Sequence, residues 1–409
     1  MKQFQIPEFY RSSIIAKVKA KRRLEDPRKK DFSPTILNFG KLRLLIARHF
    51  GFCYGVENAI EIAYRALSEN PGKRIFLLSQ MIHNPDVNDD LLANGIQFLQ
   101  DTAGKQLIPF ETLGKSDIVL IPAFGTTIEI EDRLIAQGID VQQYNTTCPF
   151  VEKVWNRSEK LGELSHTIII HGKYNHEETR ATFSRSTQNG KALILKDLKE
   201  AKLLADYVIG KKNSEDFYID FAGKYSEGFD VLKDLSKFGV VNQTTMLATE
   251  TQEITDYLRE IMIEKFGLAD IKNHMADTRD TLCYATNDNQ SSTLGLLEES
   301  ADFGIVVGGY NSSNTMHLVE ILEKKYPVFF VRGATELNSK TEVTHFNIHT
   351  KIVEKTLDFI PSKECVTIAI TSGASCPDAI VDQVIKRLLE LFEVEEGFDQ
   401  ILDKALPEI

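Results

Sequence analysis

The 409-residue sequence has only five cysteines, and none of them forms a closely spaced pair. This scarcity excludes a disulfide framework of the kind found in small secreted proteins and indicates a reducing compartment. No apolar run approaches the ~20 residues that a membrane-spanning helix needs, and no apolar signal-peptide core follows Met1. The sequence therefore predicts a cytoplasmic protein without a membrane span.

Positive charge is also in short supply, with 48 Lys and Arg against 59 Asp and Glu, a formal net charge of −11. This balance argues against a nucleic-acid partner bound over the whole surface. No Gly-x-Gly-x-x-Gly or P-loop motif follows any expected strand, which argues against a nucleotide site. The length and the 42% hydrophobic content favour a globular protein with two or three core-forming units.

Residues 1–40 have a net charge of +6, whereas the whole chain is negatively charged. We interpret them as a solvated basic arm, with the folded body starting near Lys41, and a weak contact with an anionic partner stays open. Four acidic residues make a plastid transit peptide a poorer interpretation. Residues 396–409 are expected to be a C-terminal tail.

Beyond the arm, short β-branched runs alternate with polar loops and amphipathic helices, which predicts buried parallel strands in α/β layers. In such sheets ligands bind beyond the carboxyl ends of the strands. A polar, glycine-punctuated stretch at 208–236 is expected to be a surface insertion. The expected strands are 42–47, 117–121, 167–170, 303–307 and 366–370.

Three cysteines, Cys53, Cys148 and Cys283, lie in loops expected to follow strands, separated by 95 and 135 residues. Each separation is close to one α/β unit, once the insertion is discounted, so the three thiolates could surround a common axis. Structural zinc usually takes four ligands with close pairs, whereas a 4Fe–4S cluster on three cysteines would leave one iron without a protein ligand. Burial as small apolar side chains is the alternative for any of them, and it suits Cys365; Cys376 is treated as a bystander.

The motifs around these cysteines resemble those of the 4-hydroxy-3-methylbut-2-enyl diphosphate reductase family, in order over residues 41–390, in the form of its longer cyanobacterial and plant branch. They are Gly51-Phe-Cys-Tyr-Gly-Val56, Ile82-His-Asn-Pro85, Thr146-Thr-Cys-Pro149, His171-Gly-Lys-Tyr-Asn-His-Glu-Glu-Thr179, Asn242-Gln-Thr-Thr-Met246, Cys283-Tyr-Ala-Thr286, Gly309-Tyr-Asn-Ser-Ser-Asn314 and Thr371-Ser-Gly-Ala-Ser375.

The resemblance implies three similar α/β domains around a central 4Fe–4S cluster held by Cys53, Cys148 and Cys283. We place these domains at 41–147, 148–280 and 281–395. The family removes a hydroxyl group from its allylic diphosphate by two-electron reduction, giving isopentenyl and dimethylallyl diphosphate. Ferredoxin or flavodoxin is the implied electron donor, and the oligomeric state is left open.

The resemblance also implies a diphosphate site, which we place at His83, His176, Ser312, Ser313, Asn314 and Ser375. Histidines in polar loops can carry a charge near neutral pH. Hydroxyls and free amides at helix N-termini bind anions, although simple helix capping explains the Ser and Asn residues equally well.

Glu178, with the neighbouring His176, matches the family's proton donor, and Thr244 matches the residue that touches the substrate hydroxyl. A solvated Glu at a helix start and a turn hydroxyl are the local alternatives for Glu178 and Thr244. Phe124 stands where many bacterial members have a histidine, so one diphosphate contact is expected to be missing or supplied elsewhere.

Two other function classes stay open from the residues alone. One is a non-redox Cys/His metalloprotein such as a zinc hydrolase. The other is a non-catalytic module that binds a phosphate ligand, because repeated α/β units with Ser and Asn loops suit that role as well. The metal content of protein purified without oxygen would separate the first from an iron–sulfur enzyme.

Overall fold

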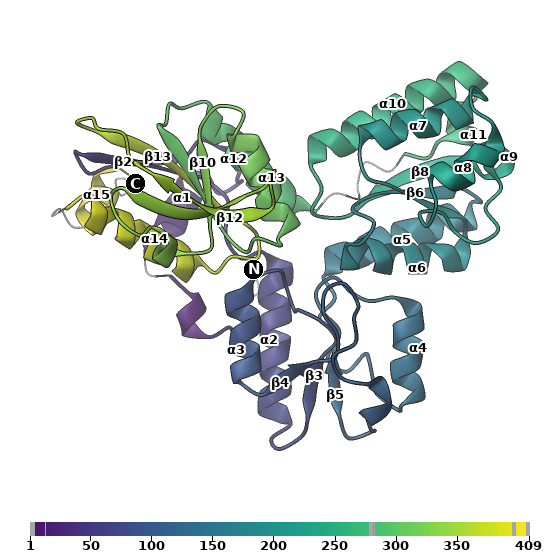
Figure 1. Ribbon diagram of the computed structural model, residues 1–409, viewed down its shortest axis with the longest axis horizontal. Helices are drawn as coiled ribbons and strands as arrows, with labels where there is room; N and C mark the ends of the chain where they lie inside the picture. The colour runs from purple at the N-terminus through teal and green to yellow at the C-terminus, as the bar shows by residue number, and fades with distance from the viewer. Residues whose placement is uncertain (1–4, 13, 278–280, 282, 395–397, 406–409) are drawn as a thin grey trace. The chain divides into compact units, whose positions relative to one another are not determined.

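The computed structural model describes residues 5–12, 14–277, 281, 283–394 and 398–405 (Figure 1). The chain forms two compact units. Unit 1 takes the described residues of 1–57, 83–87 and 284–409, and unit 2 takes 58–82 and 88–283. Both units are mixed α/β structures with mostly parallel sheets, which confirms the predicted fold class.

Unit 1 is built on a five-stranded sheet with the order β1-β2-β13-β9-β10. β1 pairs antiparallel with β2, and the other neighbours pair in parallel. The strands are β1 (Thr35–Asn38), β2 (Leu42–Ile46), β9 (Phe303–Val307), β10 (Val328–Val331) and β13 (Val366–Ser372), and a hairpin of β11 (Glu342–Asn347) and β12 (Ile352–Leu357) forms a separate two-stranded sheet.

This sheet crosses the domain boundaries expected from the sequence, because β2 lies between β1 and β13. Leu44 of β2 is in register with Ile368 of β13, and Ile370 of β13 with Ile305 of β9. The structure thus joins the start of the expected first domain to the expected third. An apolar run predicts a buried strand but carries no information about which other strand lies beside it.

The helices of unit 1 enclose a core in which the side chains of its sheet are almost fully buried. α2 begins in unit 1 and continues into unit 2, and α3 begins in the segment 83–87. The helices are α1 (Ile14–Glu25), α2 (Tyr54–Glu69), α3 (Pro85–Ala93), α12 (Tyr284–Leu297), α13 (Ser313–Leu322), α14 (Asp378–Leu391) and α15 (Phe398–Ala405).

The described part of the N-terminal segment is folded, which corrects the expectation of a solvated arm. Ile15 and Val18 of α1 belong to the core of unit 1. Asp382 of α14 accepts hydrogen bonds from the backbone N–H groups of Ile14 and Ile15, at 3.2 and 3.0 Å. The folded body therefore includes α1 and β1 and starts before Lys41.

The expected C-terminal tail is corrected in the same way, because residues 398–405 form α15, which packs against β1. Ile401 is 4% exposed, and the ring of Phe398 lies 6.1 Å from that of Phe39. Residues 396–397 and 406–409 of that expected tail, like residues 1–4 and 13 of the arm, lie outside the described residues.

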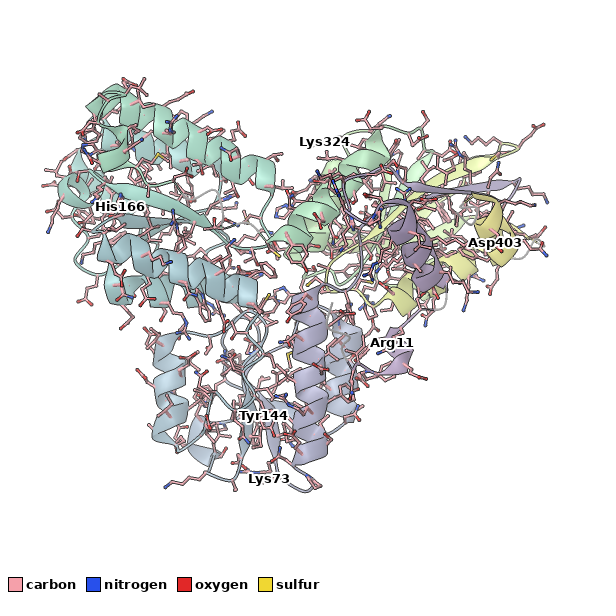
Figure 2. All side chains as sticks on the ribbon, turned by 180° about the vertical axis from the view of Figure 1, so that it is seen from behind. Arg11, Lys73, Tyr144, His166, Lys324 and Asp403 are labelled. Atoms are coloured by element: carbon pink, nitrogen blue, oxygen red, sulfur yellow. The ribbon has the colours of Figure 1, made fainter. Side chains whose placement is uncertain are left out.

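Unit 2 contains two three-stranded parallel sheets, with the orders β4-β3-β5 and β7-β6-β8. In Figure 2 the label Tyr144 marks the lobe of the first sheet, and His166 marks the lobe of the second. The strands are β3 (Ile75–Leu77), β4 (Ile96–Phe98), β5 (Ile118–Leu120), β6 (Thr167–His171), β7 (Ala192–Leu195) and β8 (Phe238–Asn242).

Strand β6 is buried on both faces, and its isoleucines separate two apolar clusters. Ile168 and Ile170 pack with Val154 of α5, whereas Ile169 faces the cluster that includes residues of α7 and α10. The helices of unit 2 are α4 (Ile128–Ala136), α5 (Pro149–Glu163), α6 (Glu177–Asn189), α7 (Leu198–Val208), α8 (Ser214–Asp220), α9 (Val231–Asp234), α10 (Ala248–Phe266) and α11 (Ile271–His274). None of the described helices in either unit is both long and apolar enough to span a bilayer.

The stretch 208–236 is part of the core of unit 2, which corrects the expected polar surface insertion. Phe217 on α8 and Phe221, the residue directly after α8, are fully buried, and Phe229 is 4% exposed. The rings of Phe217 and Phe229 stack at 5.3 Å. The polar residues of this stretch thus flank, in sequence, aromatic residues whose side chains pack in one cluster with those of α7.

Candidate functional site

In unit 1 the predicted site residues gather in loops at one edge of the sheet. β2, β13 and β9 are parallel neighbours, so the loops that follow them lie together. These loops carry Cys53 after β2, Ser312 after β9 and Ser375 after β13.

Hydrogen bonds hold these loops against one another. The Ser375 hydroxyl lies 3.4 Å from both the Ser312 hydroxyl and the backbone oxygen of His83. The backbone N–H of Ala374 donates to Asn314 Oδ1 at 2.9 Å. Ser312 caps α13 by accepting from the N–H of Thr315 at 3.3 Å. The capping interpretation therefore applies to Ser312, whereas Ser375 lies three residues before α14 and caps nothing there.

Asn314 has an unused donor, because its Nδ2 is buried and makes no hydrogen bond with any residue that the structure describes. A buried polar group without a partner costs free energy, so such a group in a folded protein calls for an explanation. This donor stands in the first turn of α13, where the positive end of the helix dipole favours an anion. Ser313 and His83 are buried in the same unit, at 2% and 8% exposure.

Cys53 joins the same loop cluster, since its backbone N–H donates to the oxygen of Ala374 at 3.2 Å. The residue is partly buried, and α2 begins at the next position. Cys53 is therefore hydrogen-bonded to the residue that directly precedes Ser375.

In unit 2 the pair Glu178 and Thr244 lies at the ends of two neighbouring parallel strands. Thr244 follows β8 and Glu178 lies in the first turn of α6, after β6. Glu178 Oε1 accepts from the backbone N–H of Thr244 at 2.5 Å, and Oε2 accepts from its hydroxyl at 2.9 Å. Both predicted residues are thus brought together in one direct contact.

The Glu178 carboxyl is removed from solvent, with 1% exposure. Burial raises its pKa to about 7 because the ionised form loses its hydration, and the two bonds from Thr244 lower it by a smaller amount. A carboxyl with this pKa is protonated in a substantial fraction of molecules at neutral pH. The geometry therefore permits Glu178 to give a proton.

His176 and Cys148 are connected to this pair through the loop that follows β5. His176 caps α6 by accepting from the Glu178 N–H through Nδ1 at 3.2 Å. The ring of Phe124 stands edge-on to the His176 ring at 5.5 Å. Cys148 donates its backbone N–H to Ala123, next to Phe124, at 2.9 Å. Phe124, expected from the sequence to leave one diphosphate contact missing, therefore packs against a predicted site histidine.

Cys283 lies on a segment that returns to the end of β8. The hydroxyl of Thr281, two residues earlier, donates to Asn242 Oδ1 at 2.7 Å. Asn242 is the last residue of β8 and lies two positions before Thr244. Cys283 is 8% exposed.

The three predicted metal-binding cysteines share one local setting, since each directly precedes a helix: Cys53 before α2, Cys148 before α5 and Cys283 before α12. The positive end of a helix dipole stabilises a thiolate, which is the form that binds iron. Cys53 belongs to unit 1 and the other two to unit 2, and all are free of disulfides. Among the described residues, no three His, Cys, Asp or Glu side chains, these cysteines included, stand close enough together to hold a metal ion.

The two remaining cysteines differ from this setting. Cys376 is fully buried, and burial raises the pKa of its thiol. Cys365 is partly buried and comes directly before β13. Neither precedes a helix in the way the other three do.

Proteins of known family resemble this chain over most of its length. The model of the LytB protein family matches residues 44–389. The chain belongs to the LytB family. The match spans every loop described above, from Cys53 to Ser375.

Curated relatives of this LytB chain include proteins named 4-hydroxy-3-methylbut-2-enyl diphosphate reductase. The relative from Synechococcus sp. (strain WH7803) is 40% identical over 358 residues, which cover 87% of each chain. That from Prochlorococcus marinus (strain NATL1A) is 37% identical and covers 95% of this chain and 92% of its own.

Two solved structures share the LytB fold. The structure of (E)-4-hydroxy-3-methyl-but-2-enyl diphosphate reductase is 24% identical, with a TM-score of 0.51, and covers 85% of this chain and 99% of its own. The reductase structure from Plasmodium falciparum is 22% identical, with a TM-score of 0.61, and covers 85% and 87%.

One structural role in this LytB chain was missed by sequence reasoning. Gln243 is 1% exposed, and its Oε1 accepts from both the Thr179 hydroxyl and the Lys173 N–H at 3.0 Å. It thereby ties the loop after β6 to α6 beside Glu178. The available signal was a glutamine directly after a continuous apolar strand, where a buried amide must find partners.

Proposed function

We propose that this chain reduces 4-hydroxy-3-methylbut-2-enyl diphosphate in the last step of the non-mevalonate isoprenoid pathway. The C–O bond to the hydroxyl group breaks, a C–H bond forms, and water leaves after the uptake of two electrons and two protons. The products are isopentenyl diphosphate and dimethylallyl diphosphate. The observation that carries this proposal is the buried Glu178–Thr244 pair in a LytB-family chain, because loss of a hydroxyl as water needs a proton donor.

The diphosphate is assigned to the loop cluster of unit 1 and to two histidines. Asn314 Nδ2 is a buried donor that has no partner among the described residues, and the N-terminus of α13 adds the positive end of a helix dipole. Hydroxyl groups and imidazoles complete a polar anion site. The assigned residues are His83, His176, Ser312, Ser313, Asn314 and Ser375.

The LytB family is an iron–sulfur enzyme family. We assign one 4Fe–4S cluster to Cys53, Cys148 and Cys283, which leaves one iron without a protein ligand. The position of each cysteine before a helix suits a thiolate ligand. When bound, the cluster supplies electrons and a Lewis-acidic iron.

Protons are handled by this chain's own residues. Glu178 gives its proton toward the leaving hydroxyl, and Thr244 holds the carboxyl in position through two hydrogen bonds. His176 fixes the backbone of Glu178 from the other side. Ferredoxin or flavodoxin is the proposed source of the two electrons.

Anaerobically purified protein tests the proposal. We expect brown protein that contains iron and sulfide and turns over the diphosphate with dithionite and methyl viologen. Cys148→Ser is expected to lose the cluster and turnover, whereas Cys365→Ser, the matched control, is expected to keep both. Colourless protein with stoichiometric zinc and no turnover would overturn the proposal in favour of a non-redox metalloprotein.

A second measurement addresses the cluster assignment. Mössbauer spectra of the anaerobic protein are expected to contain one iron site whose signal shifts when the diphosphate is added. An unchanged spectrum in protein that turns over would contradict the assignment of an iron without a protein ligand.

A further inference from the structure

A cavity of about 470 Å³ in unit 1 borders Cys53, and none of the residues assigned to the diphosphate lines it. Its wall comes from three parts of the chain that are distant in sequence. α1 and the turn after it contribute one side, the loop after β2 contributes Cys53 itself, and the first turns of α12 contribute the third. The N-terminal segment is therefore part of the surroundings of a proposed cluster ligand.

The cavity is lined mainly by positive charge, although the whole chain is acidic. Four cations, Lys19, Arg23, Lys29 and Arg48, face two carboxylates, Glu57 and Asp288. His49 adds no charge near neutral pH, because burial lowers its pKa to about 4. A cavity lined by one sign of charge concentrates the electric field and steers partners of the opposite sign.

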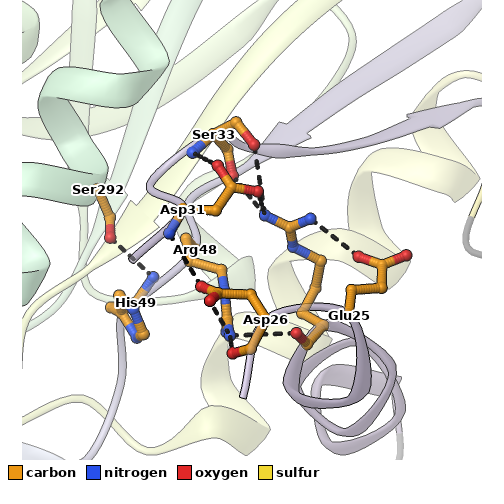
Figure 3. A network of polar contacts seen from close by, with 8 residues as sticks. Glu25, Asp26, Asp31, Ser33, Arg48, His49 and Ser292 are labelled. Carbon is orange, nitrogen blue, oxygen red and sulfur yellow. Dashed lines mark hydrogen bonds and ion pairs between the residues drawn. The ribbon is translucent and has the colours of Figure 1, made fainter. Parts of the chain in front are cut away.

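Two of these cations are already engaged. Arg48 is 5% exposed and donates to the backbone oxygens of Arg22 and Asp26 at 3.2 and 3.4 Å, in the network shown in Figure 3. Lys19 forms an ion pair of 2.7 Å with Asp378. The Arg48 contacts hold α1 and the residue after it against the loop that carries Cys53, and the Lys19 pair holds α1 against the start of α14.

The other two cations are available to a partner. Arg23 and Lys29 are exposed, and neither forms an ion pair with any residue that the structure describes. Both line the cavity. Exposed charges held near a cavity by a rigid frame suit recognition of a charged protein better than stabilisation of the fold.

We propose that Arg23 and Lys29 form the docking surface for an acidic one-electron carrier protein, which transfers its electron beside Cys53. Each docking event oxidises the carrier by one electron and reduces the cysteine-held centre by one, and two events supply the two electrons of the reaction. The inference rests on the proposed function and adds the place where the donor binds.

The test compares Arg23→Glu/Lys29→Glu with a matched control, Arg28→Glu/Lys30→Glu. The control residues are exposed, lie in the same segment and carry the same charge, but they do not line the cavity. Binding of an oxidised, acidic plant-type [2Fe–2S] ferredoxin to the holoenzyme is measured by calorimetry. We expect binding about tenfold weaker in the first variant and within about twofold of wild type in the control.

Turnover gives a second readout that separates docking from chemistry. The ratio of ferredoxin-driven to methyl-viologen-driven turnover is expected to fall about tenfold in Arg23→Glu/Lys29→Glu and to stay near the wild-type value in the control. Added salt is expected to weaken ferredoxin binding to wild type more than to the first variant. Arg23→Gln/Lys29→Gln, which removes charge without reversing it, is expected to give a smaller change in the same direction.

Two results would overturn the docking surface. Equal losses in both charge-reversed variants would show that only the overall charge of the segment matters, and unchanged ferredoxin binding in the first variant would show that these residues are not contacted. A wild-type protein without viologen-driven turnover would instead contradict the proposed function, so the two failures are distinguishable.

Discussion

Two opposing effects set the pKa of Glu178. Complete burial raises its pKa to about 7, and the hydrogen bonds from Thr244 lower it. The carboxyl is therefore divided between protonated and ionised forms close to neutral pH. A proton donor works best when its pKa lies near the working pH, so this residue is matched to a neutral environment.

Replacement of Glu178 by Gln should abolish proton donation while the side chain keeps its size. We expect turnover to fall by about 10²–10⁴-fold, the usual contribution of a positioned acid. In wild type, the donor form disappears as pH rises through the raised pKa, so turnover should decline above about pH 7. Steady-state kinetics over a pH series would measure both effects.

Glu177 provides the control for that change. It neighbours Glu178 and is also buried, but its carboxylate accepts from the Ser79 hydroxyl. Glu177→Gln should keep turnover within about tenfold of wild type, because the residue is not placed against Thr244. Equal losses in the two variants would contradict a specific role for Glu178.

Thr244 influences the pH above which turnover declines, because it donates hydrogen bonds to the Glu178 carboxyl. Thr244→Val removes the hydroxyl donor to Glu178 Oε2, and loss of a donor to a carboxylate raises its pKa further. The decline of turnover should therefore move to higher pH in Thr244→Val, whereas Thr244→Ser should keep the wild-type limit. A shift to lower pH in the valine variant would contradict this account.

At the scale of elements, α1 is attached to unit 1 through its first turn. Asp382 accepts from two backbone N–H groups that α1 cannot satisfy itself. Asp382→Ala should lower the free energy of unfolding by about 1–2 kcal/mol, the usual effect of losing a helix cap. Urea titration followed by circular dichroism would measure the change.

Asp403 is the control for the Asp382 variant, because its exposed carboxylate reaches α1 through an ion pair with the Lys21 side chain and accepts no backbone N–H of α1 among the described residues. Exposed pairs contribute about 0–1 kcal/mol, so Asp403→Ala should be close to wild type. A larger effect for Asp403→Ala than for Asp382→Ala would show that surface charge, and not the cap, attaches the helix.

Individual helices and strands were predictable where the sequence pattern that indicates them spans only a few neighbouring residues. The expected strand at 303–307 matches β9, and the expected helix that ends at Leu322 matches α13, because β-branched runs and helical periodicity act over a few residues. α8 was missed because the buried rings of Phe217 and of Phe221, directly after the helix, stand among polar and charged residues. Their four-residue spacing was the available signal.

The candidate site was predictable in part for the same reason. Loops after parallel strands collect at one edge of a sheet, which is why Ser312 and Ser375 are neighbours as expected. The sequence could not separate Glu178 from Glu177, because both are acidic residues in the first turn of one helix. The two glutamates differ in their hydrogen-bond partners, and the partner of Glu178 is Thr244, which lies 66 residues further along the chain.

At the scale of the whole molecule, the chain passes between its two units several times. The short segment 83–87 belongs to unit 1 although the residues on either side belong to unit 2. The proposed cluster ligands likewise come from both units. Pairing across such distances is set by three-dimensional packing, so the sequence predicted the class of fold but not the division into units.

Cluster binding should stabilise the folded chain, because a group bound only by the folded state shifts the unfolding equilibrium. Reconstitution of the apo protein with iron and sulfide should raise Tm by roughly 5 °C or more. Calorimetry without oxygen would measure the shift, and Cys148→Ser should not show it. A wild-type chain that takes up the cluster with no change in Tm would contradict this expectation.

The pairing of β2 with β13 has a consequence for biosynthesis. β2 ends at Ile46 and β13 begins at Val366, 320 residues later. At typical translation rates of about 5–20 residues per second, an apolar strand must wait some tens of seconds on the ribosome for its neighbour. Unit 2 can complete its folding during that interval, whereas β2 stays open to aggregation and to chaperones until the last part of the nascent chain emerges.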